Sequence, residues 1–139
     1  MSKAVWAATV TALLLAVGVH AQAQVKREPI KAIDEVSGSA TFKAYCAQCH
    51  GVSGRGDGPA AKALKTPPAD LTILAQRHNG QFPAGAVKQV INGDTANPSH
   101  GSREMPMWGP VFRSVENPSV VELRIMNLVK YLEGMQEKK

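Results

Sequence analysis

The chain has 139 residues, of which 44% are hydrophobic and only 5% aromatic, with a formal net charge of +5. This length is that of one small domain. The lysines and arginines are scattered and are not interleaved with aromatic residues, so the charge does not indicate a nucleic-acid-binding protein. A mildly positive surface suits docking onto acidic partner proteins, although it can equally be an ordinary solvated surface.

Residues 1–23 have the pattern of an export signal. Lys3 supplies a basic start, residues 4–19 are an uncharged and mostly apolar run, and Ala21-Gln22-Ala23 is a small-x-small cleavage site. The run is shorter than the about 20 residues that span a bilayer core. We therefore expect cleavage after Ala23 rather than retention as an anchor, no stable membrane span afterwards, and a periplasmic location, which is an oxidising compartment.

Residues 24–37 are polar and are interrupted by Pro29, which predicts a flexible N-terminal arm. The remaining residues, 38–139, contain no internal repeat or low-complexity tract, and we assign them to one domain. Ser39 is a good N-cap for a first helix that runs on through Tyr45.

That helix leads into Cys46-Ala47-Gln48-Cys49-His50, the pattern that is typical of c-type haem attachment. Each cysteine adds to one vinyl group of the porphyrin, and residues three apart in a helical turn lie on one face. His50 follows at once and is the expected proximal ligand of the iron. The motif predicts one covalently bound haem c.

Other uses of this pattern are less well supported. A thiol-disulfide redox pair is expected in a βαβ setting, which is not visible here. A zinc site needs further ligands, and the chain has only these two cysteines. A simple structural disulfide is the remaining alternative.

The stretch after the motif is rich in glycine and ends at Pro59. It lacks the lysine and hydroxyl residue of a phosphate-binding loop, so we interpret it as a tight loop that passes close to the haem edge. A ligating histidine normally donates its second ring N–H to an acceptor. A backbone carbonyl near Pro59 or near Pro67-Pro68 is the expected acceptor for His50.

Three short helices are expected next. They cover residues 60–65, residues 71–78 with Asp70 as N-cap, and residues 82–91, and a polar loop over 94–104 follows. The apolar side of the third helix consists of Ala86, Val87, Val90 and Ile91.

Met105-Pro106-Met107 carries the second chemical signal. A thioether opposite imidazole suits a haem that transfers electrons, and a proline stiffens the backbone that presents the sulfur. Met105 is the predicted distal ligand and Met107 the second choice. His78 and His100 are alternatives that would give a bis-histidine haem, and each can also be a solvent-facing histidine.

Several other side chains near these ligands have two possible roles. Trp108 can pack on the porphyrin or donate to a propionate, and Arg103 can pair with a propionate. The alternatives are core packing for Trp108 and solvent exposure for Arg103. Two further methionines are expected to be structural, Met126 in ordinary packing and Met135 exposed.

The last helix is expected to begin at Pro118 and Ser119, with a capping box from Ser119 to Glu122, and to end at Gly134. Its apolar residues recur at helical spacing, and they are Val121, Ile125, Leu128, Val129 and Leu132. We expect this helix to pack across the first one.

Taken together, these residues resemble the class I, monohaem cytochrome c family. Gly38 and Phe42 match the glycine and aromatic residue of that family's first helix, and Leu128 and Tyr131 match the apolar and aromatic pair of its last helix. The resemblance implies an all-α fold, with three to five helices around one covalently attached haem whose edge is exposed. It also implies His50 and Met105 as the axial ligands.

The implied function is transfer of single electrons by Fe(II)/Fe(III) cycling, without a catalytic acid, base or nucleophile. The protein is then a diffusible periplasmic carrier, or a subunit of a respiratory or dehydrogenase complex, and not an enzyme by itself. Its partners would be redox proteins that it meets through small, weak interfaces. The alternative is a haem-based sensor or small-ligand binder, which needs a labile sixth coordination position.

Overall fold

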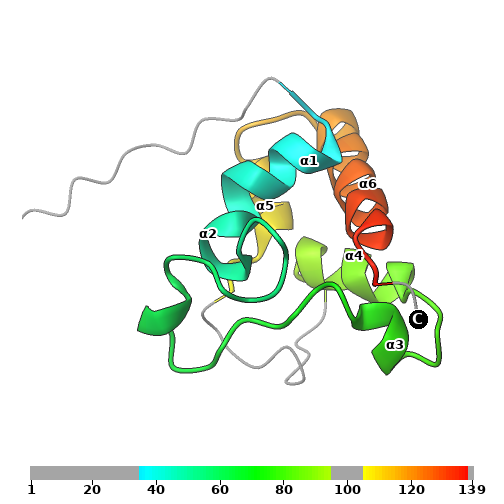
Figure 1. The fold of residues 1–139 in the computed structure, drawn as a ribbon. Coiled ribbons are helices and arrows are strands. Elements are labelled where there is room, and N and C mark those ends of the chain that lie inside the picture. Colours follow the sequence, from blue (N-terminus) through cyan, green and yellow to red (C-terminus); the bar gives the residue numbers. More distant parts are fainter. Residues whose placement is uncertain (1–34, 95–104, 138–139) are drawn as a thin grey trace, which may run out of the picture.

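The computed structural model describes residues 35–94 and 105–137, and within them the chain is helical with no strand. This confirms the predicted all-α fold (Figure 1). His100 and Arg103, like the predicted signal, lie outside the described residues. In chain order the helices are α1 (Gly38–Thr41), the π-helical turn η1 (Phe42–Cys46), α2 (Ala47–His50), the 3-10 turn η2 (Ala61–Ala63), α3 (Leu74–Arg77), α4 (Ala84–Asn92), α5 (Trp108–Arg113) and α6 (Pro118–Gly134). None of these described helices has the length and apolar composition needed to cross a membrane.

The first and last helices cross each other, as the sequence predicts. A Cβ atom placed on Gly38 would lie 2.1 Å from the backbone oxygen of Asn127 and 2.6 Å from the Cβ of Tyr131. The rings of Phe42 and Tyr131 are 5.5 Å apart, and Leu128 is buried in the same core. The glycine lets two helix backbones approach more closely than any side chain would allow.

The Gly38→Ala variant is expected to lose about 3 kcal/mol of stability, the upper part of the usual range for overpacking, because the atom it would strike is a backbone oxygen that cannot rotate away. Gly85→Ala is the matched control. Gly85 lies inside α4 with open space where a Cβ would stand, so the alanine should stabilise the fold by about 0.5–1 kcal/mol. Thermal unfolding of the haem-loaded proteins measures both, and equal effects would contradict the close crossing.

Residues 38–50 form one continuous helical stretch whose hydrogen-bond pattern changes midway. The N–H of Ala47 donates to the carbonyl of Phe42, five residues back, which defines the π-helical turn. Such turns are rare and occur frequently at functional sites. The N-cap is Ser37, whose hydroxyl accepts from the N–H of Ala40, so the expectation of Ser39 was wrong by two residues.

Helix α6 buries the apolar stripe that its sequence predicts, with Val121, Ile125, Leu128 and Leu132 inside. Its cap differs from the expected capping box at Ser119. The side chain of Asn117 accepts from the N–H of Val120, and Pro118 occupies the first turn, where its missing N–H costs nothing.

The predicted burial of Met126 and Met135 was wrong for both residues. Met126 is 54% exposed, whereas Met135 is partly buried and packs against the core. Met126 lies on the outer side of α6, and Met135 follows the end of that helix, where the chain turns back onto the loop at Gly54.

The middle of the chain covers the lower end of the molecule in Figure 1 with short helices. Helix α3 begins at Leu74 rather than at residue 71, because the Asp70 carboxylate accepts from both the N–H and the hydroxyl of Thr72 and makes a separate turn. Helix α4 begins after Pro83 and ends at Gly93, which has the positive φ of 76° that favours glycine at a helix end.

Helix α5 was not expected from the sequence. Gly109 and Pro110 both lower helix propensity, but a proline is tolerated in a first turn. A tertiary contact favours the helix in spite of these residues. A Cβ atom on Gly109 would lie 2.6 Å from the backbone oxygen of Asn92, so α5 packs tightly on the end of α4.

Candidate functional site

A cavity of about 750 Å³ opens between the helical stretch 38–50, the segment 64–71, helix α4 and the residues that lead into α5. Its size is within the usual range for ligand and cofactor sites. Most of its lining is apolar, and that part includes Phe42, Leu64, Leu71, Leu74, Ala86, Val87, Val90, Ile91, Leu128 and Leu132. The predicted apolar side of α4 therefore faces the cavity.

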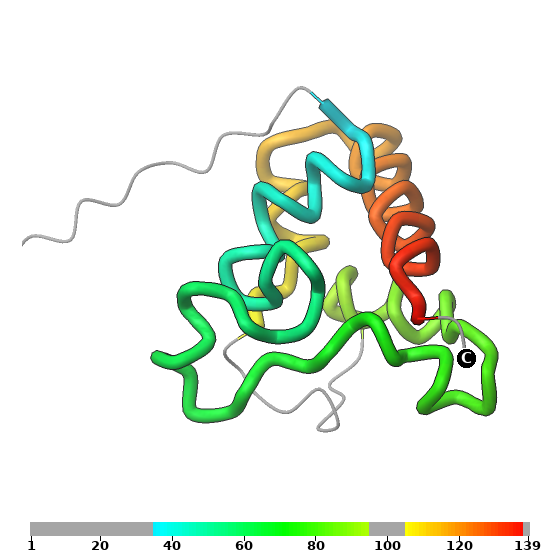
Figure 2. Tube along the Cα trace, viewed as in Figure 1, coloured from blue at the N-terminus to red at the C-terminus, as the bar shows by residue number. Residues whose placement is uncertain are grey.

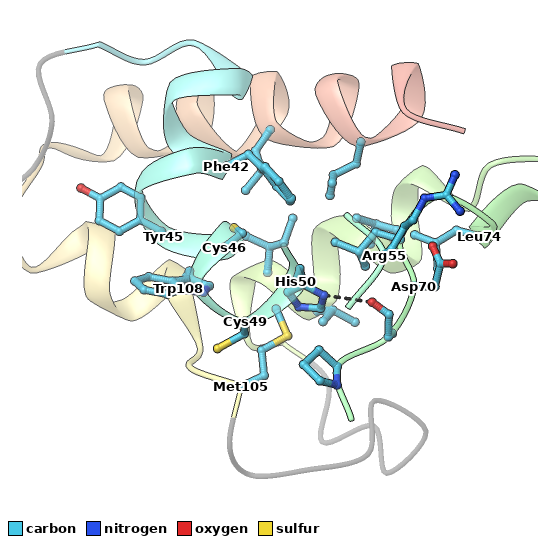
Figure 3. Close-up of a pocket in the computed structure, with 18 of the residues that line it drawn as sticks. Phe42, Tyr45, Cys46, Cys49, His50, Arg55, Asp70, Leu74, Met105 and Trp108 are labelled. Carbon is cyan, nitrogen blue, oxygen red and sulfur yellow. Dashed lines mark hydrogen bonds between the residues drawn. The ribbon is translucent and has the colours of Figure 1, made fainter. Parts of the chain in front are cut away.

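The predicted haem-binding side chains come together on this cavity. Cys46, Cys49, His50 and Met105 all line it, although Met105 is far from the other three in the sequence (Figure 3). Met107 does not line the cavity and is 59% exposed. The donor set of two thiols, an imidazole and a thioether around an apolar space fits the chemistry of a c-type haem.

His78 also reaches the cavity wall, and its hydrogen bond leaves Nε2 free, but unlike His50 it is not buried. Its Nδ1 donates to the backbone oxygen of Leu74 at 2.8 Å, and the residue as a whole is exposed at the end of α3.

The glycine-rich loop folds tightly around the end of α2. The N–H groups of Gly56, Gly58 and Ala60 donate to the carbonyls of His50, Cys49 and Gln48, respectively. These are carbonyls that a helix end leaves without a partner inside the helix. Gly56 and Gly58 are required by close approach to the chain's own backbone, because a Cβ atom on them would lie 2.4 Å from the oxygen of Pro68 and 2.5 Å from the oxygen of Gln48, respectively.

His50 is buried and oriented by one hydrogen bond. Its Nδ1 lies 3.0 Å from the backbone oxygen of Ala69, and because a carbonyl only accepts, the ring donates there (dashed line in Figure 3). The acceptor directly follows Pro67-Pro68, the second of the two regions that the sequence predicts for it. Burial lowers the pKa of His50 and outweighs the opposing effect of the Ala69 hydrogen bond. The neutral ring that results is the form that binds a metal.

The two cysteines are free thiols in this structure and lie three residues apart on the cavity wall. Burial, with a smaller effect of Cys49, raises the pKa of the Cys46 thiol to about 12. A thiol-disulfide redox pair needs the opposite, a thiol whose pKa is lowered. In the described part of the chain, no group of three or more His, Cys, Asp or Glu residues is placed to hold a metal ion.

An aromatic cluster supports the cavity wall near Met105. The ring of Tyr45 lies 5.1 Å from the ring of Trp108 and 5.1 Å from that of Phe112, and Trp108 and Phe112 are stacked at 5.7 Å. Trp108 also lines the cavity. It therefore packs in the aromatic cluster and at the same time borders the space that a ligand would fill.

Charged side chains gather at one side of the cavity. Arg55, Asp70 and Arg77 line it there, and Figure 3 shows Arg55 and Asp70 on the side away from Cys49 and Met105. Burial opposes ionisation of Asp70, but the hydrogen bonds from Thr72 and the nearby arginines outweigh it and hold the pKa of Asp70 below its ordinary value.

This shift predicts a contribution to acid stability. A carboxyl group whose folded pKa is depressed stabilises the fold above its unfolded pKa of about 4, and that contribution is lost as the pH falls further. Because Asp70 is in contact with water, we expect the Asp70→Asn variant to lose less than about 1 kcal/mol at pH 7 and to differ less from the wild type below pH 3. Unfolding at several pH values measures this, with Asp94→Asn on an exposed position as control. A loss that is the same at every pH would contradict the assignment.

The family of cytochrome c oxidase, cbb3-type, subunit III, has a family model that matches residues 34–122. The chain belongs to this family. It is therefore a c-type cytochrome domain, which confirms the resemblance stated from the sequence, and its class of function is haem-based electron transfer. A search of curated proteins and a search of solved structures gave no match.

Some residues of this cytochrome site were missed by sequence reasoning. Arg55 and Arg77 line the cavity, and the sequence analysis gave neither of them a role. A signal was available for Arg55, which stands between Gly54 and Gly56 in the loop directly after the haem motif. The acceptor for His50, the Ala69 carbonyl, was predicted only to its region, because every residue has a carbonyl.

Proposed function

We propose that this chain is an exported cytochrome that transfers single electrons through one haem, held covalently by Cys46 and Cys49 and axially by His50 and Met105. The observation that carries the proposal is that these four side chains, from two separate stretches of the chain, line one apolar cavity. Methionine opposite histidine favours a relatively high reduction potential among haem ligand sets.

Haem bound here supplies an iron that gains and loses one electron. The chain's own residues would hold that iron from two sides of the cavity. His50 is fixed through Ala69, and Met105 lines the same cavity directly before Pro106, which stiffens the backbone there. With haem bound, the apolar lining would keep water away from the iron, and Arg55 and Arg77 would be placed to neutralise the carboxylates of the porphyrin.

The test is an absorption spectrum of the protein made in a host with haem maturation, oxidised, then reduced, then exposed to carbon monoxide. We expect sharp reduced bands that do not change with carbon monoxide, and a denatured mass that includes one haem. Bands that shift with carbon monoxide would support the small-ligand binder instead. A denatured mass without haem would contradict covalent attachment through Cys46 and Cys49.

We further propose that the protein meets acidic redox partners, either as a diffusible periplasmic carrier or as part of a larger complex. The formal net charge is +5 for the full chain and would be +4 once Lys3 is removed with the signal, and this positive charge supports the choice of partner. Fractionation of the producing cells tests the location, and purification under mild conditions separates the two arrangements. A partner retained at fixed stoichiometry is expected only of a complex subunit.

A further inference from the structure

The Ala69 carbonyl belongs to a backbone segment that continues through residues 70–72. Hydrogen bonds within this segment, and one to Gly54, fix the course of its backbone. The Asp70 carboxylate accepts from the N–H of Thr72 at 2.8 Å and from its hydroxyl at 2.6 Å, and Thr72 is buried. The N–H of Leu71 donates to the carbonyl of Gly54 at 2.7 Å. Residues 70–72 therefore have a defined backbone direction, and the Ala69 carbonyl adjoins them directly.

This segment is also held by the three residues that follow α6, which we call the C-terminal clasp: Met135, Gln136 and Glu137. Gln136 uses both ends of its side-chain amide. Its Nε2 donates to the backbone oxygens of Leu71 at 2.8 Å and Leu132 at 2.7 Å, and its Oε1 accepts from the N–H of Ala75 at 2.9 Å.

Its neighbours in the clasp bind the same segment. The N–H of Glu137 donates to the carbonyl of Thr72 at 2.9 Å, and the methyl group of Met135 lies against Gly54. Figure 2 shows the end of α6, in red, meeting the green stretch that leads into α3. The clasp thus connects the last helix to the segment whose carbonyl orients His50.

We propose that Gln136 is a positioning residue for electron transfer: by fixing residues 71–75 it holds the Ala69 carbonyl against His50 and so helps to set the reduction potential. This inference rests on the proposed role of His50 as the proximal ligand. A hydrogen bond from Nδ1 makes the imidazole a stronger donor to the metal, and a stronger donor favours Fe(III). Loosening the clasp weakens that bond and raises the reduction potential.

The experiment compares Gln136→Met with the wild type, both loaded with haem. Methionine keeps the length of the side chain and removes all three hydrogen bonds. The control is Gln89→Met, the same exchange on an exposed position of α4 that lies outside the cavity lining. We expect a higher reduction potential for Gln136→Met only, and exchange of the His50 Nδ1 proton, followed by NMR, that is about tenfold faster, as the loss of ordinary hydrogen bonds implies.

Unchanged potential and unchanged proton exchange in Gln136→Met would overturn the proposal, and so would equal changes in Gln89→Met. If Gln136→Met does not fold, Gln136→Asn replaces it, because it keeps an uncharged amide that is one carbon too short to reach all three partners, and the same shifts are expected. Two other results would instead refute the proposed function: a wild-type protein without covalent haem, or a His50 variant that keeps the wild-type spectrum. A failure of the proposed function can therefore be distinguished from a failure of the proposal for Gln136.

Discussion

The Met105→Ala variant is expected to lose the sixth ligand of the iron while the haem stays attached. Cys46, Cys49 and His50 are unchanged, so the denatured mass should still include one haem. The reduced protein should now bind carbon monoxide, and its absorption bands should shift when the gas is added. The reduction potential should fall by on the order of 0.1 V, a fraction of the about 0.8 V over which axial ligands set haem potentials.

Met107→Ala is the matched control for this prediction. Met107 is two residues away, on the other side of Pro106, but it is 59% exposed and does not line the cavity. Its replacement should leave the spectrum, the carbon monoxide response and the potential unchanged. The opposite pattern, with the change in Met107→Ala and none in Met105→Ala, would exchange the roles of the two methionines.

This pair also shows what the sequence can and cannot predict about the site. The sequence has two methionines around one proline, and the proline is a reason to expect that one of the two sulfurs binds the iron. The sequence does not tell which of the two side chains points into the cavity. That depends on how α5 packs against the end of α4, through the close contact of Gly109 with Asn92. The helix α5 itself was missed for the same reason, because a tertiary contact overrides its low propensity.

Local sequence patterns predicted the buried faces of the helices better than the residues that cap the helix ends. The spacing of Val121, Ile125, Leu128 and Leu132 predicts a buried stripe, and the structure has it, because helical periodicity depends only on neighbours in the sequence. The choice between Ser37 and Ser39 as N-cap depends on one or two residues of helix length, which periodicity does not resolve.

Arg124 had no place in the sequence prediction, and it carries the largest expected effect on stability. Its side chain is completely buried, although an arginine within an apolar stripe is normally expected at the surface. It forms an ion pair with Glu116 through two nitrogens, and it lies 5.7 Å over the ring of Phe112. Its hydrogen bond with Glu116 raises the pKa of Arg124, so the side chain stays charged.

The same guanidinium also ties the start of the domain to α6. Its Nη1 donates to the backbone oxygen of Glu35 at 2.9 Å and to the hydroxyl of Thr41 at 3.2 Å. Nearby, the side chain of Asn127 donates to the backbone oxygen of Val36 at 3.0 Å. Glu35 and Val36, which the sequence analysis assigned to the arm, are thus held against the last helix.

We expect Arg124→Met to lose about 3–5 kcal/mol, because it leaves the Glu116 carboxylate, only 9% exposed, without its buried counter-charge. Thermal unfolding of the haem-loaded protein should show a fall of roughly 12 °C or more. The spectrum of the folded variant should match the wild type, since Arg124 does not line the cavity. Glu122→Gln breaks the exposed pair with Lys88 and should cost less than about 1 kcal/mol.

The double variant Arg124→Met/Glu116→Leu separates the loss of the ion pair from the cost of an unpaired charge. Replacing both members of a buried pair by apolar residues is often neutral or stabilising, whereas removing one is strongly destabilising. We therefore expect the second substitution to restore most of the stability that the first removes. If the double variant were as unstable as Arg124→Met alone, the hydrogen bonds from Arg124 to Glu35 and Thr41, and not the buried charge of Glu116, would be the main source of the stability.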